Sequence, residues 1–542
     1  MTPIRLPFSR LLLACLLAAT GLPVCGAQEQ ETPTAARPSS GGEPAASDSY
    51  PDAGSVTREE FSALVRRLAA TEAELRRLRA APADASNGGG LSDEYTAVGG
   101  STYRAAPGTL PSRLPDSGAT FDGATSLLDA SVAPGAAAPA APAPEKKFPT
   151  VQVNGVFQAD TGFFHQDANS VATYGHIQDG AAFRRARLSA KGSVTETMNY
   201  FMQMDFAFFG RPTFTDVWLE SVDFPVLGNV RIGQWKQPFS LEVVSSFRYT
   251  TFMERSVLFQ PFTPFRHLGI GFYNHSDDLK NTWAASFFRS GQDQFGGSIS
   301  TDGGWGTAER MTWLPYWDDA TEGESYLHLG AGHYFNSPPK DAVNFRTIPE
   351  FYVGENASGV VGTSGQAAPG GFDGTPYFLK TGTLSVSQFN VFGSELLLVR
   401  GPWSVQAEGM LNYVQPTSGN SAVLPGAYVQ VGWFLTGEHR PYDRVAGAID
   451  RVIPHENFFR VNTVDGPATG MGAWEVAARW SRIDLSDQGI HGGQMTDWTL
   501  GLNWYMNPYS KLVFNYIRSQ PDVPGHGRSD TDIFAMRAQL DF

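Results

Sequence analysis

Cysteine is almost absent from this 542-residue chain, which has two, Cys15 and Cys25. Both lie within the first 27 residues, ahead of the part that carries a folding pattern. If that stretch is removed, the chain has no disulfide, no thiol nucleophile and no thiolate metal site. Its stability and its chemistry must then come from other groups.

The first 27 residues have the pattern of a secretory signal. The only long apolar run of the chain, Leu11 to Ala19, follows Arg5 and Arg10 and precedes small residues. This pattern predicts export, with cleavage after Ala27. Lipoprotein processing before the second cysteine is the alternative, which the bulky Val24 disfavours.

The sequence also lacks spanning helices and an excess of positive charge. No stretch after the signal reaches the roughly 18 apolar residues that a transmembrane helix needs. The formal net charge is −14, which excludes a globally basic nucleic-acid binder. An acidic total does not exclude an anion channel, because a pore responds to the charge of its lining.

Catalytic motifs are missing as well. The chain contains no Gly-x-Ser-x-Gly, no His-Glu-x-x-His and no phosphate-binding loop, and these are patterns that mark hydrolases, metalloproteases and nucleotide enzymes. His439, His455 and His491 are isolated along the chain and are interpreted as loop histidines. We therefore expect no enzyme, no cofactor and no metal site.

The segment between the signal and residue 148 is mostly linker. Residues 28–56 and 81–147 are rich in Pro, Ala, Ser and Gly, a composition that cannot bury a core. Between them, residues 57–80 begin with a capping box and carry apolar residues at heptad spacing, with one polar member. A short coiled coil is favoured over a solitary amphipathic helix on a surface. The seam consists of Phe61, Leu64, Leu68, Thr71, Leu75 and Leu78.

Residues 148–542 have the pattern of a transmembrane antiparallel β-barrel. The C-terminal run alternates apolar residues such as Phe534 and Met536 with polar residues such as Arg537 and Gln539, and it ends on Phe542. Such a run alone also fits an edge strand of a soluble β-sandwich. Similar alternating segments of about ten residues recur through the region, which favours the barrel. Its length predicts about 16 strands, within an even number between 14 and 18.

An arginine-rich strand is the sharpest local feature of this region. Arg185, Arg187 and Lys191 share one strand face, and this face should point into the lumen because cations facing lipid cost about 2–4 kcal/mol each. Arg184 falls on the opposite phase, so it must lie near an interface or be shifted by a bulge. Asp216 is expected on the wall for charge balance. The row could bind anions or merely shape a field across the pore.

Residues 236–268 form a long segment rich in Pro and Phe. Lipid would leave its backbone groups without partners. We therefore predict a loop that is folded into the barrel, packed by its aromatic residues, and that presents Arg248, Arg255 and Arg266 to a constriction.

Several of these stretches resemble the phosphate- and pyrophosphate-selective porins of the O and P type. The similar motifs are Phe183-Arg184-Arg185-Ala186-Arg187-Leu188, Met204-Asp205-Phe206-Ala207, Gly233-Gln234-Trp235-Lys236-Gln237-Pro238-Phe239, Glu254-Arg255, Gly432-Trp433-Phe434-Leu435-Thr436-Gly437-Glu438, Gly472-Ala473-Trp474-Glu475-Val476 and Leu500-Gly501-Leu502-Asn503-Trp504. The resemblance covers about 148–542 and thins between 285 and 380. It implies a trimeric, 16-stranded porin that passes phosphate-like anions by diffusion.

The resemblance carries the family's pore residues over only in part. It assigns the paired arginines to Arg184 and Arg185, the lumen aspartate to Asp216 and the arginine of the constriction loop to Arg255. The lysine of the central anion site falls at Val243. Of the family's arginine ladder only Arg346 remains, and Glu350 adds an acid nearby. Selectivity for phosphate is therefore expected to be weaker than in specialised members.

The sequence thus predicts an outer-membrane porin for small anions, with phosphate or polyphosphate among the expected solutes. The alternative is a structural or adhesive outer-membrane protein that holds the envelope through its N-terminal coiled coil. The expected partners are two further copies in a homotrimer, outer-membrane lipid, small anions and the cell wall, but no nucleic acid. The candidate pore residues are Arg184, Arg185, Arg187, Lys191, Asp216, Arg248, Arg255, Arg266 and Arg346.

Overall fold

The structure is a computed structural model that describes residues 147–542, except 208–211, 226, 292–300, 355–373 and 464–465. The predicted signal, the linkers and the coiled coil at 57–80 lie outside the described residues. No helix among the described residues has both the length and the apolar character needed to cross a membrane.

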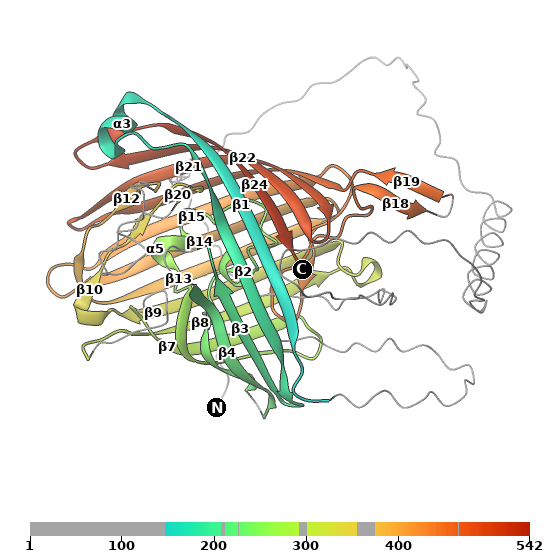
Figure 1. Cartoon of the computed structure of the whole chain (residues 1–542). Helices are drawn as coiled ribbons and strands as arrows, with labels where there is room; N and C mark the ends of the chain where they lie inside the picture. The colour runs from blue at the N-terminus through green and yellow to red at the C-terminus, as the bar shows by residue number, and fades with distance from the viewer. Residues whose placement is uncertain (1–146, 208–211, 226, 292–300, 355–373, 464–465) are drawn as a thin grey trace, which may run out of the picture. The chain divides into compact units, whose positions relative to one another are not determined.

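One antiparallel sheet curves round and closes on itself (Figure 1). It has eighteen strands, of which β10 (Ala342–Val343) and β23 (Gly527–Arg528) are two-residue additions, so sixteen strands form the barrel wall. The predicted count is confirmed. The wall strands are β1 (Gln152–Gln166), β2 (Gly180–Thr195), β3 (Met198–Asp205), β4 (Thr213–Phe224), β5 (Gly228–Lys236), β6 (Arg266–His275), β7 (Asn281–Arg289), β8 (Trp305–Trp317), β9 (Ser325–Ser337), β13 (Leu384–Arg400), β14 (Trp403–Pro416), β15 (Ala422–Phe434), β20 (Ala473–Asp487), β21 (Ile490–Asn507), β22 (Ser510–Val523) and β24 (Thr531–Asp541).

The remaining elements are short and lie in the connections. Among them, α3 begins where the side chain of Asp167 accepts a hydrogen bond from the Ser170 amide at 2.6 Å, as an N-cap does. The helices are α3 (Ala168–Tyr174), α4 (Leu241–Val244), α5 (Phe259–Phe262), η1 (Asp319–Thr321) and η2 (Pro339–Asp341). The small strand pairs are β11 (Arg346–Thr347) with β12 (Leu379–Lys380), β16 (Tyr442–Asp443) with β17 (Ala448–Ile449), and β18 (Phe459–Thr463) with β19 (Gly466–Gly470).

The first and last strands close the barrel. β1 pairs with β24 in continuous register from Val156 opposite Asp541 to Gln166 opposite Thr531. The terminal residue extends this seam, because the Phe542 amide and carbonyl both bond to Gly155, at 3.0 and 2.9 Å. A β-carbon on Gly155 would lie 2.4 Å from the Phe542 ring, so the ring can lie there only against glycine. No edge strand of the wall is left unpaired at this seam.

Alternation along the last strand follows the prediction. On β24 the outward side chains Phe534, Met536 and Leu540 are exposed, and the inward side chains Arg537 and Gln539 are buried. Because successive side chains of a strand point to opposite faces, the apolar set faces lipid and the charged set faces the lumen.

The two ends of the barrel differ. At the turn end, β2–β3, β13–β14 and β21–β22 are joined by turns, and the C-terminus lies there; at the loop end the connections β5–β6 and β9–β13 are long (Figure 1). Tryptophans stack in pairs at the turn end, with ring centroids 4.9 Å apart for Trp403 and Trp433 and 5.0 Å for Trp474 and Trp504. Such a belt is typical of a membrane interface.

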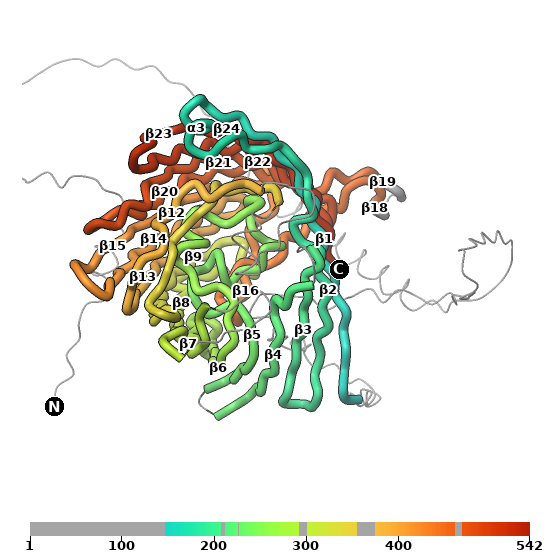
Figure 2. The backbone as a smooth tube through the Cα atoms, turned by 60° about the vertical axis from the view of Figure 1, so that its left-hand side comes forward, coloured from blue at the N-terminus to red at the C-terminus, as the bar shows by residue number. Residues whose placement is uncertain are grey.

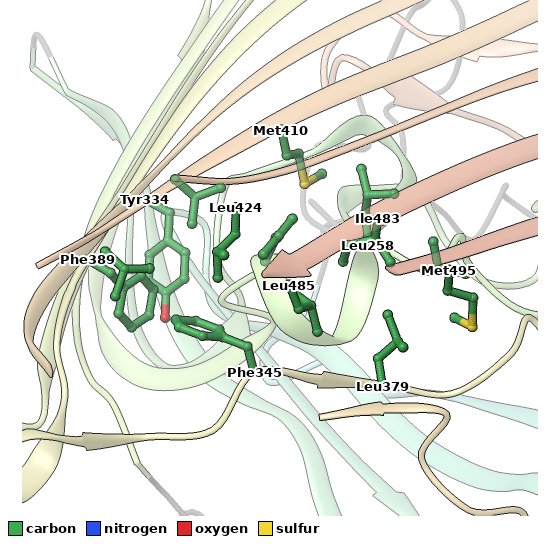
Figure 3. Close-up of a cluster of buried hydrophobic side chains, with 14 of the residues drawn as sticks. Leu258, Tyr334, Phe345, Leu379, Phe389, Met410, Leu424, Ile483, Leu485 and Met495 are labelled. Atoms are coloured by element: carbon green, nitrogen blue, oxygen red, sulfur yellow. The ribbon is translucent and has the colours of Figure 1, made fainter. Parts of the chain in front are cut away.

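The alternation suggested a lumen lined by polar groups. In the structure, part of the lumen is lined by apolar groups instead. Near the loop end, inward residues of β9, β13–β15, β20 and β21 are apolar and pack against residues that come from loops (Figure 3). Inward-folded segments cover the wall there and bury this cluster, which we call the lumen core. Its labelled members are Leu258, Tyr334, Phe345, Leu379, Phe389, Met410, Leu424, Ile483, Leu485 and Met495.

Candidate functional site

Residues 237–265 connect β5 to β6 and are here called the constriction loop. They fold into the lumen of the barrel, as the sequence predicted (Figure 2). The loop reaches the far wall: the carboxylate of Glu408 on β14 accepts hydrogen bonds from the amides of Leu241 and Glu242 at 3.1 and 2.8 Å. These are free amides of the first turn of α4, which a carboxylate caps well.

Two cations hold the first bend of the constriction loop. The ammonium of Lys236 donates to the carbonyls of Val243 and Ser245 at 2.7 and 3.0 Å. The guanidinium of Arg255 donates to the Glu242 carbonyl at 2.8 Å and, more weakly, to the same two carbonyls. Arg255, predicted to be a pore residue, therefore also holds the loop backbone. The Val243 side chain is fully buried.

Glu254 ties the constriction loop to the wall. Its carboxylate accepts from Arg184 at 2.9 Å and from Arg537 at 2.6 Å, and it lies 3.8 Å from Arg185. Burial raises the pKa of Glu254, but attraction by the three guanidiniums outweighs burial and holds its pKa below the usual range. Arg537 is also paired with Asp160 at 2.7 Å. We call this group the Glu254 latch.

A β-bulge explains the phase of Arg184. The β1–β2 register jumps from Gln158 opposite Arg185 to Ala159 opposite Phe183, which leaves Arg184 as the extra residue. The bulge lets both arginines reach Glu254 from inside the barrel. The sequence required a bulge or an interface position at Arg184, and the structure has the bulge.

The wall formed by β2–β6 carries paired charges opposite the constriction loop. Arg187 lies 2.7 Å from Asp205, and Arg266 lies 2.6 Å from Asp216. All four side chains are largely buried. We call this surface, with Arg184, Arg185 and Lys236, the cation wall. The acids balance the charge, as was expected for Asp216.

Phenylalanines of the constriction loop stack on these cations. The ring of Phe247 has guanidinium carbons of Arg185 and Arg187 at 4.5 and 4.7 Å from its centroid, and that of Arg248 at 5.9 Å. The Phe265 ring lies 4.7 Å from the guanidinium of Arg266. Rings at these distances attract cations.

Glu350 has surroundings that the sequence did not suggest. It was expected to add a repulsive acid to the anion route. Instead its buried carboxylate accepts from Arg479 at 2.8 Å and from Ser481 at 2.6 Å. Arg479 also contacts Glu242 of the constriction loop at 3.2 Å. Glu350 is therefore neutralised, and it holds residues 342–354 against β20.

A third inward segment, residues 437–455, enters from the turn end and was missed by the sequence analysis. Arg440 pairs with Glu475 and donates to the Tyr249 carbonyl at 3.0 Å, and Arg451 pairs with Asp541. This turn-end segment thus contacts the constriction loop from the turn end of the barrel. The signal that could have found it is spacing: the connection between β15 and β20 spans 435–472, whereas other turn-end connections are short.

Two candidate residues lie apart from this cluster. Lys191 lies on the lumen phase of β2, near the turn end, and makes no ion pair within the described residues. Arg346 lies on β11 at the loop end, with its guanidinium 4.3 Å from the Tyr377 ring centroid. The other predicted residues meet at the constriction loop. They are Arg184, Arg185, Arg187, Asp216, Arg248, Arg255 and Arg266.

A family model described as "Phosphate-selective porin O and P" matches residues 151–542. The chain belongs to this family. Porin O of Pseudomonas aeruginosa is 23% identical over 432 residues, which are 73% of this chain and 89% of that protein. An uncharacterised protein of Caulobacter vibrioides is 25% identical over 355 residues, 62% of each chain.

Solved porins have a related architecture at low identity. OmpT of Vibrio cholerae, described as a trimer form, matches 72% of this chain and 99% of its own, at 10% identity and a TM-score of 0.43. An anion-selective porin from Comamonas acidovorans matches 72% and 99%, at 11% identity and a TM-score of 0.41. Family membership makes this chain an outer-membrane porin. Its turn end then faces the periplasm, as short turns do in such barrels.

Proposed function

We propose that small anions diffuse passively through this barrel along the cation wall, between the constriction loop and strands β2–β6. The observation that carries this route is the asymmetry of the lumen. The opposite side, near the loop end, is filled by the lumen core, and a close-packed apolar core leaves no path for a hydrated ion. The charged side is where an ion finds partners.

The charge balance of this route supports a preference for anions. Among the described residues, twelve cations lie on or contact the constriction loop, and they meet nine acids on the loop or paired with these cations. The cations are Arg184, Arg185, Arg187, Lys236, Arg248, Arg255, Arg266, Arg440, Arg451, Arg479, Lys511 and Arg537; the acids are Asp160, Asp205, Asp216, Glu242, Glu254, Glu350, Glu408, Glu475 and Asp541. A narrow passage with low-dielectric walls strengthens the effect of such an excess on passing ions.

The oligomer is proposed to be a homotrimer, because the chain belongs to a family of porins and resembles a porin described as a trimer. Unheated and boiled samples on a denaturing gel test this directly. A band of high apparent mass that boiling converts to the unfolded monomer is expected. The same monomer band in both samples contradicts the trimer.

Reversal potentials in asymmetric potassium chloride test the anion route. The native channel should prefer chloride. Arg187→Gln should reduce the preference, because it leaves Asp205 without its 2.7 Å partner in the cation wall. Arg518→Gln is the matched control. Arg518 also pairs with acids, Asp530 and Asp532, but its side chain is 43% exposed and lies away from the cation wall. A cation-preferring native channel contradicts the proposed function.

A further inference from the structure

A small cavity lies at the turn end of the barrel, where the constriction loop, the turn-end segment and the wall meet. Its lining includes Arg248 of the loop, Arg451 of the turn-end segment, Lys511 of β22 and Asp541 of β24. The turn that joins β21 to β22 completes the lining, and Tyr509 of this turn is 37% exposed. The cavity therefore opens toward the turn end. The space open to the centre of a water-sized particle is about 10 Å³, which is room for about one water molecule.

Two of the three cations that line the cavity have no acid bonded to them. Arg248 is largely buried, and its guanidinium makes no hydrogen bond with any described residue; its nearest acid, Asp541, is 3.9 Å away. Lys511 is also buried, and among the described residues its ammonium donates only to the Thr250 carbonyl, at 3.0 Å. A guanidinium has five N–H donors and an ammonium has three, so most of the donors of these two side chains are unused.

Asp541 does not supply the missing negative charge, because it is paired with Arg451. The guanidinium of Arg451 is held in place by two rings as well, at 5.1 Å from the ring centroid of Tyr249 and 4.8 Å from that of Tyr509. The lining thus carries three cations and one acid, an excess of two positive charges. Buried cations without a partner are costly, so this lining favours an anion over a water molecule in the cavity.

We propose that this cavity binds one chloride-sized anion, with Arg248 and Lys511 as its donors. The bound ion joins three separate segments of the chain, because the cavity is shared by the constriction loop, the turn-end segment and β22. Chloride accepts hydrogen bonds from any direction and is only slightly larger than water. Phosphate has five heavy atoms and exceeds the room. The site holds an ion in place, whereas the cation wall passes ions.

Thermal unfolding of the native protein tests the site when chloride is replaced stepwise by gluconate at constant ionic strength. Gluconate is too large for the cavity, and constant ionic strength keeps the screening of surface charges unchanged. A ligand that binds only the folded state stabilises it by mass action. For a barrel of this size the midpoint should therefore rise by about 1–2 °C for each tenfold increase in chloride above its dissociation constant.

Lys511→Met keeps the length of the side chain and removes its charge. This variant should lose the chloride dependence without a lower midpoint in gluconate, because it also removes a buried ammonium that has no acid partner. Arg248→Gln should weaken the dependence in the same way, and it carries the test if Lys511→Met does not assemble. Lys280→Gln is the matched control. Lys280 is an exposed lysine at the same end of the barrel, in the turn between β6 and β7, and its variant should keep the native dependence.

Crystals grown in bromide locate the ion. An anomalous peak is expected in the cavity between Arg248 and Lys511 of the native protein, and it should be absent from Lys511→Met. Three results would overturn the inference: a native midpoint that does not respond to chloride, a native response in Lys511→Met, or a cavity that holds only water in bromide. Each would leave the anion route standing, because the reversal potential tests that route independently.

Discussion

Glu254→Gln is expected to loosen the constriction loop without unfolding the barrel. The native carboxylate joins the loop to β2 through Arg184 and to β24 through Arg537, at 2.9 and 2.6 Å. The amide keeps the shape of the side chain but removes its charge. Its three guanidinium neighbours are then left in a buried place with less opposing charge, and the loop should leave the wall more often.

The magnitude follows from the burial of the latch. The side chain of Glu254 is 11% exposed, and removing one partner from a buried ion pair costs about 3–5 kcal/mol. Arg537 keeps its pair with Asp160 at 2.7 Å, which places the cost near the lower end. Since about 1.4 kcal/mol is a factor of ten, about 3 kcal/mol raises the population of the released loop roughly a hundredfold.

Single-channel recording measures this change as the frequency and dwell time of transitions between conductance levels. The variant should switch far more often than the native channel. Glu309→Gln is the control, because Glu309 pairs with His333 on the outward face and its side chain is 42% exposed, where a pair contributes at most about 1 kcal/mol. Native-like dwell times in Glu254→Gln would refute the reasoning about the latch.

Acid titration gives a second test with a defined sign. Because the pKa of Glu254 lies below its usual range, its stabilisation is present above the unfolded pKa of about 4.3 and is lost as the pH falls through the folded value. The contribution of Glu254 to holding the loop should therefore be constant above the unfolded pKa and be lost only in stronger acid. Switching that begins at higher pH points to another buried acid of the loop, Glu242, whose pKa is raised by burial.

The other predictions concern the same inward segments. Arg255→Ala should lower both the chloride preference and the unfolding temperature, because it removes a cation and three donor contacts to loop carbonyls; an unchanged reversal potential would show that Arg255 only supports the loop. Arg440→Gln leaves Glu475 buried without its partner, so thermal scans should show a loss of stability of about 3–5 kcal/mol, and an unchanged midpoint would contradict this role. Val243→Lys puts a lysine where the family resemblance places that of the central anion site. The Val243 side chain is fully buried and its carbonyl accepts from Lys236 and Arg255, so this variant should destabilise the loop without tightening phosphate block; tighter block with native stability would show that the side chain reaches the anion route.

The barrel could be predicted from the sequence because its rule is local. Each strand must present apolar groups to lipid on every second residue, and β24 does so from Phe534 to Leu540. The same rule predicted that Arg185 and Arg187 share a lumen face and that Arg184 needs a bulge. The aromatic loop between β5 and β6 was predictable for a related reason, because its backbone could not be satisfied in lipid.

The interior of the pore was less predictable because it depends on contacts between distant segments. Nothing local to Glu350 shows that Arg479, far along the chain, will neutralise it. Nothing local to Leu424 or Ile483 shows that residues 342–354 and the constriction loop will cover them. From the sequence alone, an inward apolar side chain on a strand only breaks the expected alternation. Its role becomes clear once the loop that covers it is known.

These inward segments also explain how a wall of ordinary porin type can acquire its own solute preference. The strands fix where Arg185 and Arg187 point, but the constriction loop decides what they meet: both meet the ring of Phe247, and Arg185 also lies 3.8 Å from the carboxylate of Glu254. Stacking on a ring leaves the in-plane donors of a guanidinium available, and Arg187 uses one of them to donate to Asp205 at 2.7 Å while it lies over Phe247. The loop therefore adds an aromatic contact to guanidiniums that the strands already pair. Selectivity should therefore change with substitutions in residues 237–265 as well as with those in the cation wall, such as Arg187→Gln.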